Sequence, residues 1–305
     1  MKNEPSFEHF SERYSAHQSQ VVWTTMVADL ETPVSAMLKL TDGQSNTFLL
    51  ESVEGGKVRG RFSIIGMNPD IIWKFKRQEV QINRRARLDA NDFEICSEEP
   101  LVSLRKLIDE SRIELPDGLP PMASGIFGYM GYDSVRLSED IPDRNEDELK
   151  VPDGLFLRPT LICIFDRLED IVTVVTPVWP DKGVSAGSAF ERAITRLKDA
   201  TVNFQRSVPY RREKPASNTD IQEPSSNTTR EEFHQMVNKA KEYITAGDIF
   251  QVVPSQRFSV PFNLPPMALY RSLRRLNPSP YLFFFDFGEF SIVGSSPEIL
   301  VTLKD

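Results

Sequence analysis

A row of polar side chains on one predicted strand is the part of the sequence best suited to chemistry. Residues 248–260 read as a strand, and alternation places Gln251, Ser255 and Arg257 on the same face. An amide, a hydroxyl and a guanidinium in line could bind a polar substrate, although an ordinary solvated strand face has the same pattern. Pro254 has no backbone donor, so the strand should lie at a sheet edge or carry a bulge there.

A helix is predicted to lead into this strand. Thr229 and Glu232 form a capping box, in which each side chain meets the backbone N–H of the other residue. Apolar residues then recur at helical spacing, and Gly247 provides the left-handed conformation that closes a helix. The apolar face consists of Phe233, Met236, Val237, Ala240 and Ile244.

The rest of the chain contains strand and helix patterns of ordinary length. Alternating or continuous apolar runs predict strands over residues 21–28, 46–52, 58–66, 71–75, 80–83, 160–166, 171–178, 281–287, 290–294 and 299–303. Helical spacing predicts helices that begin at Pro33 and that span residues 100–112, 190–202 and 266–276. We expect an α+β protein, mostly antiparallel β-sheet with helices outside.

Composition divides the chain into four parts. Residues 1–20 are polar and predict a loosely held tail or a short helix. Residues 211–228 contain a single large aliphatic side chain, Ile221, and predict a linker or long surface loop. We therefore expect one domain over residues 21–210 and the first part of a second domain over residues 229–305.

Charge and cysteine content exclude several kinds of partner. A net charge of -8 argues against nucleic acid, because that binding needs basic side chains, and it gives no reason to expect a membrane surface. Cys96 and Cys163 have no CxxC spacing and the histidines are scattered, so a thiolate or imidazole metal site is not expected. The sequence lacks a signal-peptide pattern and any apolar stretch of ~20 residues. We expect a cytoplasmic protein.

The polar strand also carries a resemblance to a known family. GDIFQVVPSQRF, residues 247–258, resembles the GDIFQVVLSQRF signature of the chorismate-utilising enzymes, and specifically of anthranilate synthase component I. Pro254 is the one departure. The resemblance implies the fold of the anthranilate and aminodeoxychorismate synthases. It runs from about Val21 to Asp305, and it looks like the first three fifths of a component I polypeptide, a truncated form of that fold.

Three further motifs fit the same family and imply a regulatory site. LLES, residues 49–52, and NPSPYLFF, residues 277–284, line the feedback site for tryptophan in this family, and GRFSIIG, residues 60–66, resembles the family's GRYSFIG. Leu282 stands where the family usually has methionine, a change of similar volume that should be tolerated. The residues that the resemblance places at L-tryptophan are Ser52, Pro280, Tyr281 and Leu282, with Glu51 alongside.

The resemblance also implies catalytic roles for two residues. Related isochorismate and salicylate synthases have a lysine base at the position of Gln251, whereas neutral ammonia needs no base, so glutamine fits an aminating enzyme. Gln251 could instead only bond a neighbouring strand. Glu298, in GSSPE, aligns with the general acid that protonates the departing C4 hydroxyl. That role requires burial or negative neighbours to keep the carboxyl protonated, and a surface glutamate is the alternative.

The implied reaction converts chorismate and ammonia, through 2-amino-2-deoxyisochorismate, to anthranilate and pyruvate in tryptophan biosynthesis. Ammonia would come from a separate glutamine amidotransferase subunit in a hetero-oligomer, because no Cys-His-Glu arrangement here could hydrolyse glutamine. In the family the Mg²⁺ ligands come from a later segment, so we expect no metal site in this chain and no activity from the 305-residue chain alone.

Two alternatives remain at this point. Aminodeoxychorismate synthase is a close rival, but its corresponding strand usually reads more like GDCYQVN, so IFQVV favours anthranilate synthase. The chain as it stands could also be a tryptophan-binding regulatory fragment without catalysis. Product analysis would separate the first pair, and the following codons of the reading frame would test the second alternative.

Overall fold

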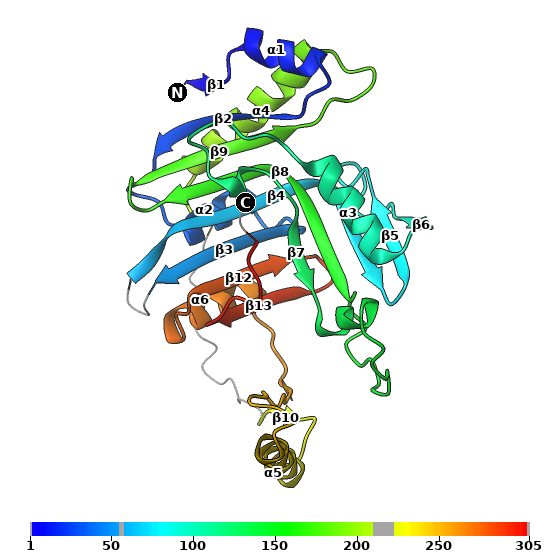
Figure 1. The fold of residues 1–305 in the computed structure, drawn as a ribbon. Helices are drawn as coiled ribbons and strands as arrows, with labels where there is room; N and C mark the ends of the chain where they lie inside the picture. The colour runs from blue at the N-terminus through cyan, green and yellow to red at the C-terminus, as the bar shows by residue number, and fades with distance from the viewer. Residues whose placement is uncertain (1, 55–57, 210–222, 304–305) are drawn as a thin grey trace. The chain divides into compact units, whose positions relative to one another are not determined.

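The chain forms two compact units (Figure 1). The structure is a computed structural model that describes residues 2–54, 58–209 and 223–303. Unit 1 contains Met1–Tyr210 and Pro266–Asp305, and unit 2 contains Arg211–Pro265.

An antiparallel sheet forms the body of unit 1. Among the described residues it has eleven strands, and its main path runs β1-β2-β9-β8-β4-β3-β12-β13. Off this path, β5 pairs with β4, β6 pairs with β5, and β7 pairs with β8. These strands are β1 (Asn3–Glu4), β2 (Gln20–Val27), β3 (Thr47–Glu54), β4 (Val58–Lys76), β5 (Glu79–Asn83), β6 (Glu94–Cys96), β7 (Phe127–Met130), β8 (Gly154–Asp166), β9 (Ile171–Val178), β12 (Tyr281–Asp286) and β13 (Ser291–Ser296). The expected α+β class with a mostly antiparallel sheet is confirmed.

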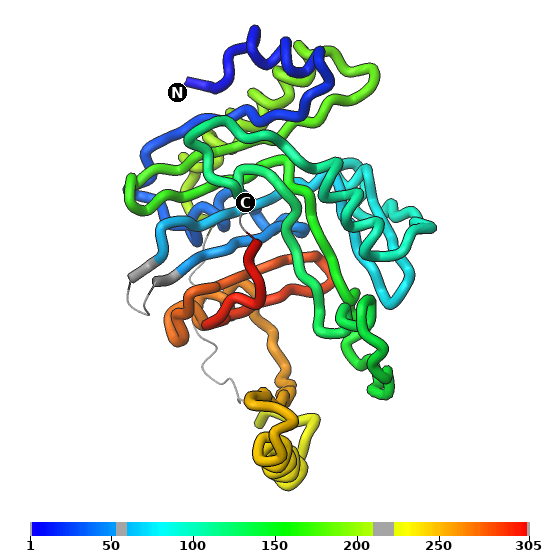
Figure 2. Tube along the Cα trace, in the orientation of Figure 1, coloured from blue at the N-terminus to red at the C-terminus, as the bar shows by residue number. Residues whose placement is uncertain are grey.

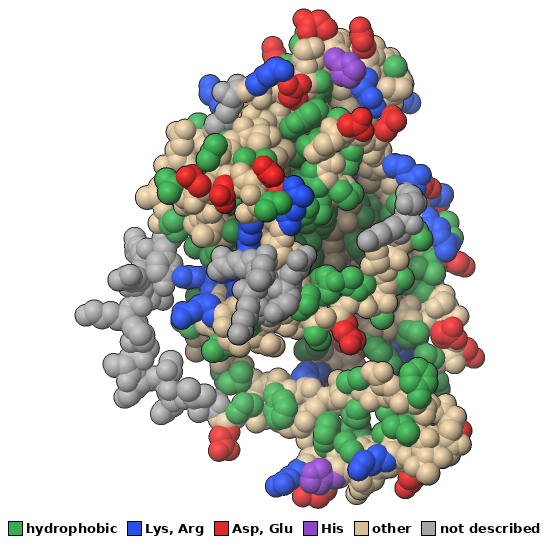
Figure 3. Space-filling model, turned by 60° about the vertical axis from the view of Figure 1, so that its left-hand side comes forward, with side chains coloured by type: hydrophobic (Ala, Val, Ile, Leu, Met, Phe, Trp, Pro, Cys, Tyr) green, Lys and Arg blue, Asp and Glu red, His purple; other side chains and the backbone are tan. Residues whose placement is uncertain are grey.

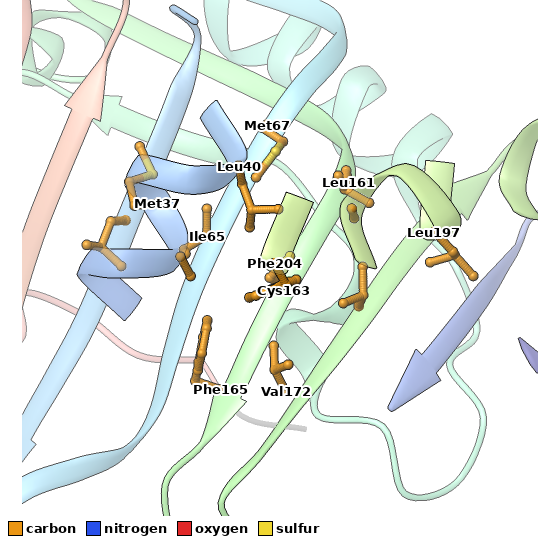
Figure 4. Close-up of a cluster of buried hydrophobic side chains, with 14 of the residues drawn as sticks. Met37, Leu40, Ile65, Met67, Leu161, Cys163, Phe165, Val172, Leu197 and Phe204 are labelled. Carbon is orange, nitrogen blue, oxygen red and sulfur yellow. The ribbon is translucent and has the colours of Figure 1, made fainter. Parts of the chain in front are cut away.

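Four helices cover one face of this sheet, and side chains from all of them join its largest core cluster. They are α1 (Phe7–Ser15), α2 (Pro33–Thr41), α4 (Ala186–Phe204) and α6 (Pro266–Leu276). Figure 4 shows part of this core, where Met37 and Leu40 of α2 and Leu197 and Phe204 of α4 lie in the same cluster as Cys163 of β8. Burial of the Cys163 thiol raises its pKa to about 12, so this cysteine serves as a small apolar side chain.

The opposite face of the sheet packs against loops and short helices. Ile162 and Ile164 alternate with Cys163 along β8 and meet side chains of residues 113–123, including the 3₁₀ helix η1 (Pro121–Ala123). Helix α3 (Pro100–Ser111) covers β5 and the end of β4, where Trp73 donates through Nε1 to Ser103 Oγ at 3.0 Å. A second 3₁₀ helix, η2 (Tyr132–Leu137), follows β7.

Strand β4 differs from the two separate strands expected over residues 58–66 and 71–75. It continues through Asn68 and Pro69 with a change of register against β8 between Pro69 and Ile71. Asn68 has φ of +54° there, a conformation that asparagine adopts more readily than most residues. The irregularity accommodates a proline inside a central strand without ending the pairing.

The N-terminal segment is better ordered than the expected polar tail. Helix α1 begins at the N-cap Ser6, whose side chain accepts from the backbone N–H of His9. Phe10 is fully buried and Tyr14 is 6% exposed, and both belong to the main core. Two aromatic residues at i and i+4 thus anchor the helix, a signal that the polar composition of residues 1–20 hides.

Unit 2 confirms the predicted helix and corrects the predicted strand. Helix α5 (Arg230–Ala246) has the Thr229–Glu232 capping box and ends at Gly247 with φ of +83°. The strand expected over 248–260 is wrong: only β11 (Phe258–Ser259) is a strand, and it pairs with β10 (Ser225–Ser226). A strand needs a neighbour along its length, and the described part of unit 2 offers two residues; Pro254 also lacks a donor.

Apolar side chains of unit 2 are largely exposed. Figure 3 shows hydrophobic side chains on the surface of the molecule. The most exposed in unit 2 is Phe250, at 93%, followed by Val253 at 80%. The apolar faces that the sequence assigned to α5 and to the following segment are therefore present but uncovered within the described residues.

Residues 266–303 belong to unit 1, whereas residues 229–265 belong to unit 2. The domain expected over residues 229–305 stays a prediction. Figure 2 shows the trace of β12 running between β3 and β13. The pairing of β12 with β3 buries Leu282, Phe284 and Phe285 in unit 1. Residues 299–303 are exposed and have no regular structure, so the strand predicted there is wrong. The predicted linker lies mostly in residues 211–222, outside the described residues.

Candidate functional site

The pairing of β3 with β12 brings together two motifs that are more than two hundred positions apart in the sequence. Tyr281 lies opposite Ser52, and Leu282 lies opposite Glu51. Pro280 immediately precedes the paired strand and is half-buried. Four of the five residues predicted at the tryptophan site thus lie on one strand pair and Pro280 adjoins it, which makes this pair the candidate site.

The five residues divide between the two faces of the sheet. Directly opposed residues of an antiparallel pair point to the same face, and successive residues point to opposite faces. Glu51 and Leu282 face the helix-covered side, where Leu282 joins the main core. Ser52 and Tyr281 face the other side, next to Leu50 and Phe283. A ligand on one face can thus touch the side chains of only part of the predicted set.

Glu51 is the centre of a buried ionic cluster. Its side chain is 1% exposed. Its carboxylate accepts hydrogen bonds from three side chains that are distant in sequence, one in the turn after β8 and two on α6. Tyr270 Oη donates to Oε2 at 2.7 Å, Arg274 donates to Oε2 at 2.5 Å and to Oε1 at 2.9 Å, and Arg167 Nη2 donates to Oε1 at 2.6 Å. The same Arg167 nitrogen donates to Ser63 Oγ at 2.9 Å. Glu51 thereby fastens α6 to β3.

Neighbouring guanidinium groups and a phenol keep Glu51 ionised although it is buried. Burial by itself raises the pKa of Glu51, but the hydrogen bonds and charges of Arg274, Tyr270 and Arg167 outweigh it, so the pKa lies below its usual value. Burial and the Glu51 carboxylate together raise the pKa of Tyr270, so its phenol remains a donor. Burial lowers the pKa of Arg274, but its hydrogen bond and Coulomb attraction to Glu51 exceed that effect and leave it raised.

These pKa shifts predict a pH-dependent contribution to stability. Since the pKa of Glu51 is lower in the folded state, its contribution is full above the unfolded value of about 4.5 and is lost as pH falls through the folded pKa. The difference in unfolding free energy between the wild type and Glu51→Gln, measured in urea, should shrink from pH 7 towards pH 3. A difference that stays constant over this range would contradict the assignment. The other carboxylates titrate in both proteins, so their contributions cancel in the difference between wild type and variant.

Ser52 lies in an irregularity of the neighbouring strand pair. Glu51 pairs with Ser63 and Val53 with Arg59, so residues 60–62 of β4 stand opposite Ser52 alone. Ser52 Oγ donates to the backbone carbonyl of Phe62 at 3.4 Å. A Cβ on Gly60 would overlap Ser52 Oγ, which explains glycine there. Bulges of this kind re-aim side chains and recur beside functional sites.

The start of β12 is fixed by the NPSP sequence. Asn277 follows the last residue of α6, and Pro278 prevents the helix from continuing. Ser295 Oγ of β13 donates to the Asn277 carbonyl at 2.8 Å. Tyr281 then remains 37% exposed on its face of the sheet, whereas Leu282 is 2% exposed. Tyr281, Pro280 and the half-buried Ser52 are the accessible members of the predicted set.

The two predicted catalytic residues are both exposed among the described residues. Gln251 is exposed in unit 2, in a segment without regular structure. Glu298 is exposed in unit 1, two residues after β13, and its backbone N–H and carbonyl meet Ser296 Oγ at 3.5 and 3.1 Å. The described residues do not bury Glu298, as a protonated acid would need. The roles of both residues stay predictions.

Sequence reasoning missed the partners of Glu51. Arg167 lies in the turn between β8 and β9, and Tyr270 and Arg274 lie on α6 at i and i+4. One signal was available: Glu51 alternates with Leu49 on the buried face of a strand, and a buried carboxylate requires cationic or hydrogen-bonding partners. Nothing local identified which side chains these would be.

The described residues show neither a metal site nor a membrane helix. Within residues 2–54, 58–209 and 223–303, no group of three or more His, Cys, Asp or Glu side chains could hold a metal ion. Over the same ranges, no helix is long and apolar enough to cross a bilayer.

Comparison with known proteins gives the same family throughout. Residues 64–305 match the family described as chorismate binding enzyme. Anthranilate synthase component 1 of Cereibacter sphaeroides is 50% identical over 300 residues, which cover 98% of this chain and 60% of that protein. The same-named protein of Pseudomonas putida is 38% identical over 284 residues, covering 92% of this chain and 56% of its own length. The chain thus spans about three fifths of these relatives.

Two solved structures resemble the fold. Anthranilate synthase component I of Streptococcus pneumoniae superposes with a TM-score of 0.63 at 27% identity, covering 92% of this chain and 59% of that one. The menaquinone-specific isochorismate synthase of Escherichia coli gives a TM-score of 0.50 at 16% identity, covering 96% of this chain and 54% of that one. The second comparison supports the fold alone.

Proposed function

Because this chain belongs to the chorismate-binding enzyme family, we propose that it is the N-terminal part of an anthranilate synthase component I. In this proposal the polypeptide that contains it converts chorismate and ammonia to anthranilate and pyruvate in the cytoplasm, as a step of tryptophan biosynthesis. The 50% identity to a protein of that name over 98% of the chain carries the proposal.

The β3–β12 pair supports a feedback site for L-tryptophan in the same proposal. Ser52 provides a hydroxyl and Tyr281 a partly exposed aromatic ring. Leu50 and Phe283 are their apolar neighbours on the same side of the sheet. On the other face, Glu51 and Leu282 would hold the strand pair and α6 in place without touching the ligand directly. The motif therefore combines binding residues with supporting residues.

Ammonia would come from a glutamine amidotransferase subunit, and Mg²⁺ would be held by residues outside the described part of the chain. The name component 1 of the relatives fits a partner component. The described residues contain no cluster that fits a metal ion, so none of them is assigned to Mg²⁺.

Product analysis tests the proposed activity. The polypeptide that contains this chain would be incubated with chorismate, ammonium and Mg²⁺, and the aminobenzoate isomers would be separated. Ortho-aminobenzoate with equimolar pyruvate is the expected result. Para-aminobenzoate, or its aminodeoxychorismate precursor, would assign the protein to aminodeoxychorismate synthesis instead.

Gln251 provides a second test, aimed at the choice of nucleophile. Gln251→Lys would place an amine that can activate water where we propose that ammonia attacks. We expect ammonia-dependent anthranilate formation to fall by about 100-fold or more, the low end of the contribution of a group in general acid–base catalysis, with isochorismate as a new product. Gln256→Lys, a change of the same type on the same segment, should have the smaller effect. Unchanged anthranilate formation by Gln251→Lys would show that the residue does not face the reacting carbon.

A further inference from the structure

A cluster of four arginine residues in unit 1 shares one carboxylate partner, that of Asp70. Arg87 lies in the loop between β5 and β6, Arg158 lies on β8, and Arg192 and Arg196 lie on α4. None of the four belongs to the predicted tryptophan site or to the two predicted catalytic residues. An inference about this arginine cluster therefore does not depend on the proposed function.

Arg158 takes up the carboxylate of Asp70. Its Nε donates to Asp70 Oδ1 at 2.8 Å and its Nη2 donates to Oδ2 at 2.7 Å, which is a bidentate pair. The same guanidinium lies over the ring of Trp179, 4.0 Å from its centre. These contacts hold Arg158 in place and use both oxygens of Asp70. The other three arginines are left without an ionic partner of their own.

Arg196 is half-buried and has one neutral partner. Its Nη1 donates to Oγ1 of Thr176, a fully buried residue of β9, at 2.9 Å. A guanidinium carries several N–H donors, and Thr176 is the one acceptor that the described residues provide for Arg196. Its Nε and Nη2 are not among the enclosed, unpartnered atoms of the described chain. These two nitrogens therefore remain open to a ligand from solution.

Two further positive charges lie near Arg196. Arg192 precedes it by one turn of α4, so the two side chains share a helix face. Arg87 follows Ala86, whose N–H donates to the Asp70 carbonyl at 3.3 Å. Burial and the charges of Arg87 and Arg192 lower the pKa of Arg196 to about 10, against the opposing effect of Asp70. The three guanidinium groups thus repel one another, and within the described residues none of them forms an ion pair.

We propose that Arg87, Arg192 and Arg196 bind a phosphate group. Guanidinium forks match the geometry of phosphate oxygens, and the hydrogen bonds between them are strengthened by charge. The oxygens would accept from Nε and Nη2 of Arg196 and from the exposed side chains of Arg87 and Arg192. A phosphate dianion would also offset the repulsion among the three cations. The group would be either free inorganic phosphate or the phosphate of a monoester, which share this chemistry.

A compact dianion suits the arginine cluster better than other anions. A carboxylate brings one negative charge and two oxygens, so it would leave more of the repulsion among the guanidinium groups in place. A long polyanion would extend beyond the cluster over a protein whose net charge is -8, and it would be repelled there. Phosphate should therefore saturate a single site.

Calorimetric titration tests the choice of ligand. The polypeptide that contains this chain would be titrated with sodium phosphate in a buffer that contains no other oxyanion and no Mg²⁺. We expect a dissociation constant on the order of 0.1 mM, with acetate at least about tenfold weaker. Phenyl phosphate distinguishes the two sources. Equal or weaker affinity than phosphate assigns the site to the free ion, and affinity about tenfold tighter assigns it to an ester; both results support a phosphate site.

Two variants test the assigned residues. Arg192→Met and Arg196→Met each remove one donor group and should weaken phosphate roughly tenfold or more. Arg192 is exposed, so its variant should fold even if Arg196→Met does not. Arg84→Met, in the same loop as Arg87 but at an exposed ion pair with Glu110, is the matched control and should leave binding unchanged.

Three results would overturn the proposal. They are no saturable heat with phosphate, acetate that binds as tightly as phosphate, and Arg192→Met that binds phosphate like the wild type. Polyglutamate provides the remaining comparison. If it bound to the wild type while phosphate did not, and lost affinity in Arg192→Met, the cluster would belong to an acidic protein partner instead.

Discussion

Replacing Glu51 with alanine should lower the free energy of unfolding by about 3–5 kcal/mol, the range for a buried ion pair that loses one member. Glu51 is 3% exposed, and its carboxylate is the shared acceptor of Arg167, Tyr270 and Arg274. The substitution would leave two guanidinium groups close together in a poorly hydrated place. Urea unfolding of the wild type and the variant at pH 7 measures the difference.

Glu110, which forms an exposed salt bridge, provides a control that separates the effect of the buried Glu51 cluster from the loss of an ordinary salt bridge. Glu110 pairs with Arg84 at 2.8 Å, but the two side chains are 35% and 51% exposed. Exposed pairs contribute about 0–1 kcal/mol, so Glu110→Ala should be nearly neutral. Equal midpoints for the two variants would mean that the cluster around Glu51 does not hold α6 on the sheet.

Local sequence patterns predicted most helices and strands, because each pattern reports burial or hydrogen bonding within a short segment. Alternation in residues 171–178 and the capping box at Thr229 each describe a local interaction, and β9 and α5 are present as expected. The choice of partners is not local. No pattern in residues 47–54 specifies that β12 will pair with them, and it was the family resemblance of two motifs that placed them together.

The strand predictions that were wrong failed because a local pattern does not provide a partner strand. Residues 248–260 have strand alternation, yet a strand is stable only where another strand meets its backbone groups, and β10 meets two of them. Residues 299–303 likewise have a strand composition without a neighbour among the described residues. At the candidate site, the three donors around Glu51 come from elements that are distant from it in sequence, and no local pattern identifies them.

Ser52→Phe should raise the tryptophan concentration for half-maximal inhibition by about 100-fold or more, equivalent to ~2.7 kcal/mol of binding free energy, while chorismate turnover is largely kept. Ser52 stands alone opposite residues 60–62, and Gly60 already fills the space against its hydroxyl. A phenyl ring at this position must therefore turn towards Tyr281, the paired residue on the same face. That is the space in which we propose that the indole or the amino-acid group of tryptophan lies.

Ser52→Ala separates the filling of this space from the loss of the hydroxyl. Alanine leaves the space open and removes one half-buried hydroxyl whose bond to Phe62 is long, so inhibition should weaken only about tenfold or less. Both variants would be measured in the polypeptide that contains this chain, with tryptophan inhibition curves and direct calorimetric binding. Since Ser52 is only half-buried and faces the side of the sheet opposite the Glu51 cluster, we expect both variants to fold. Inhibition of Ser52→Phe at wild-type tryptophan concentrations would place the ligand elsewhere and leave the bulge at Ser52 as a feature of the fold alone.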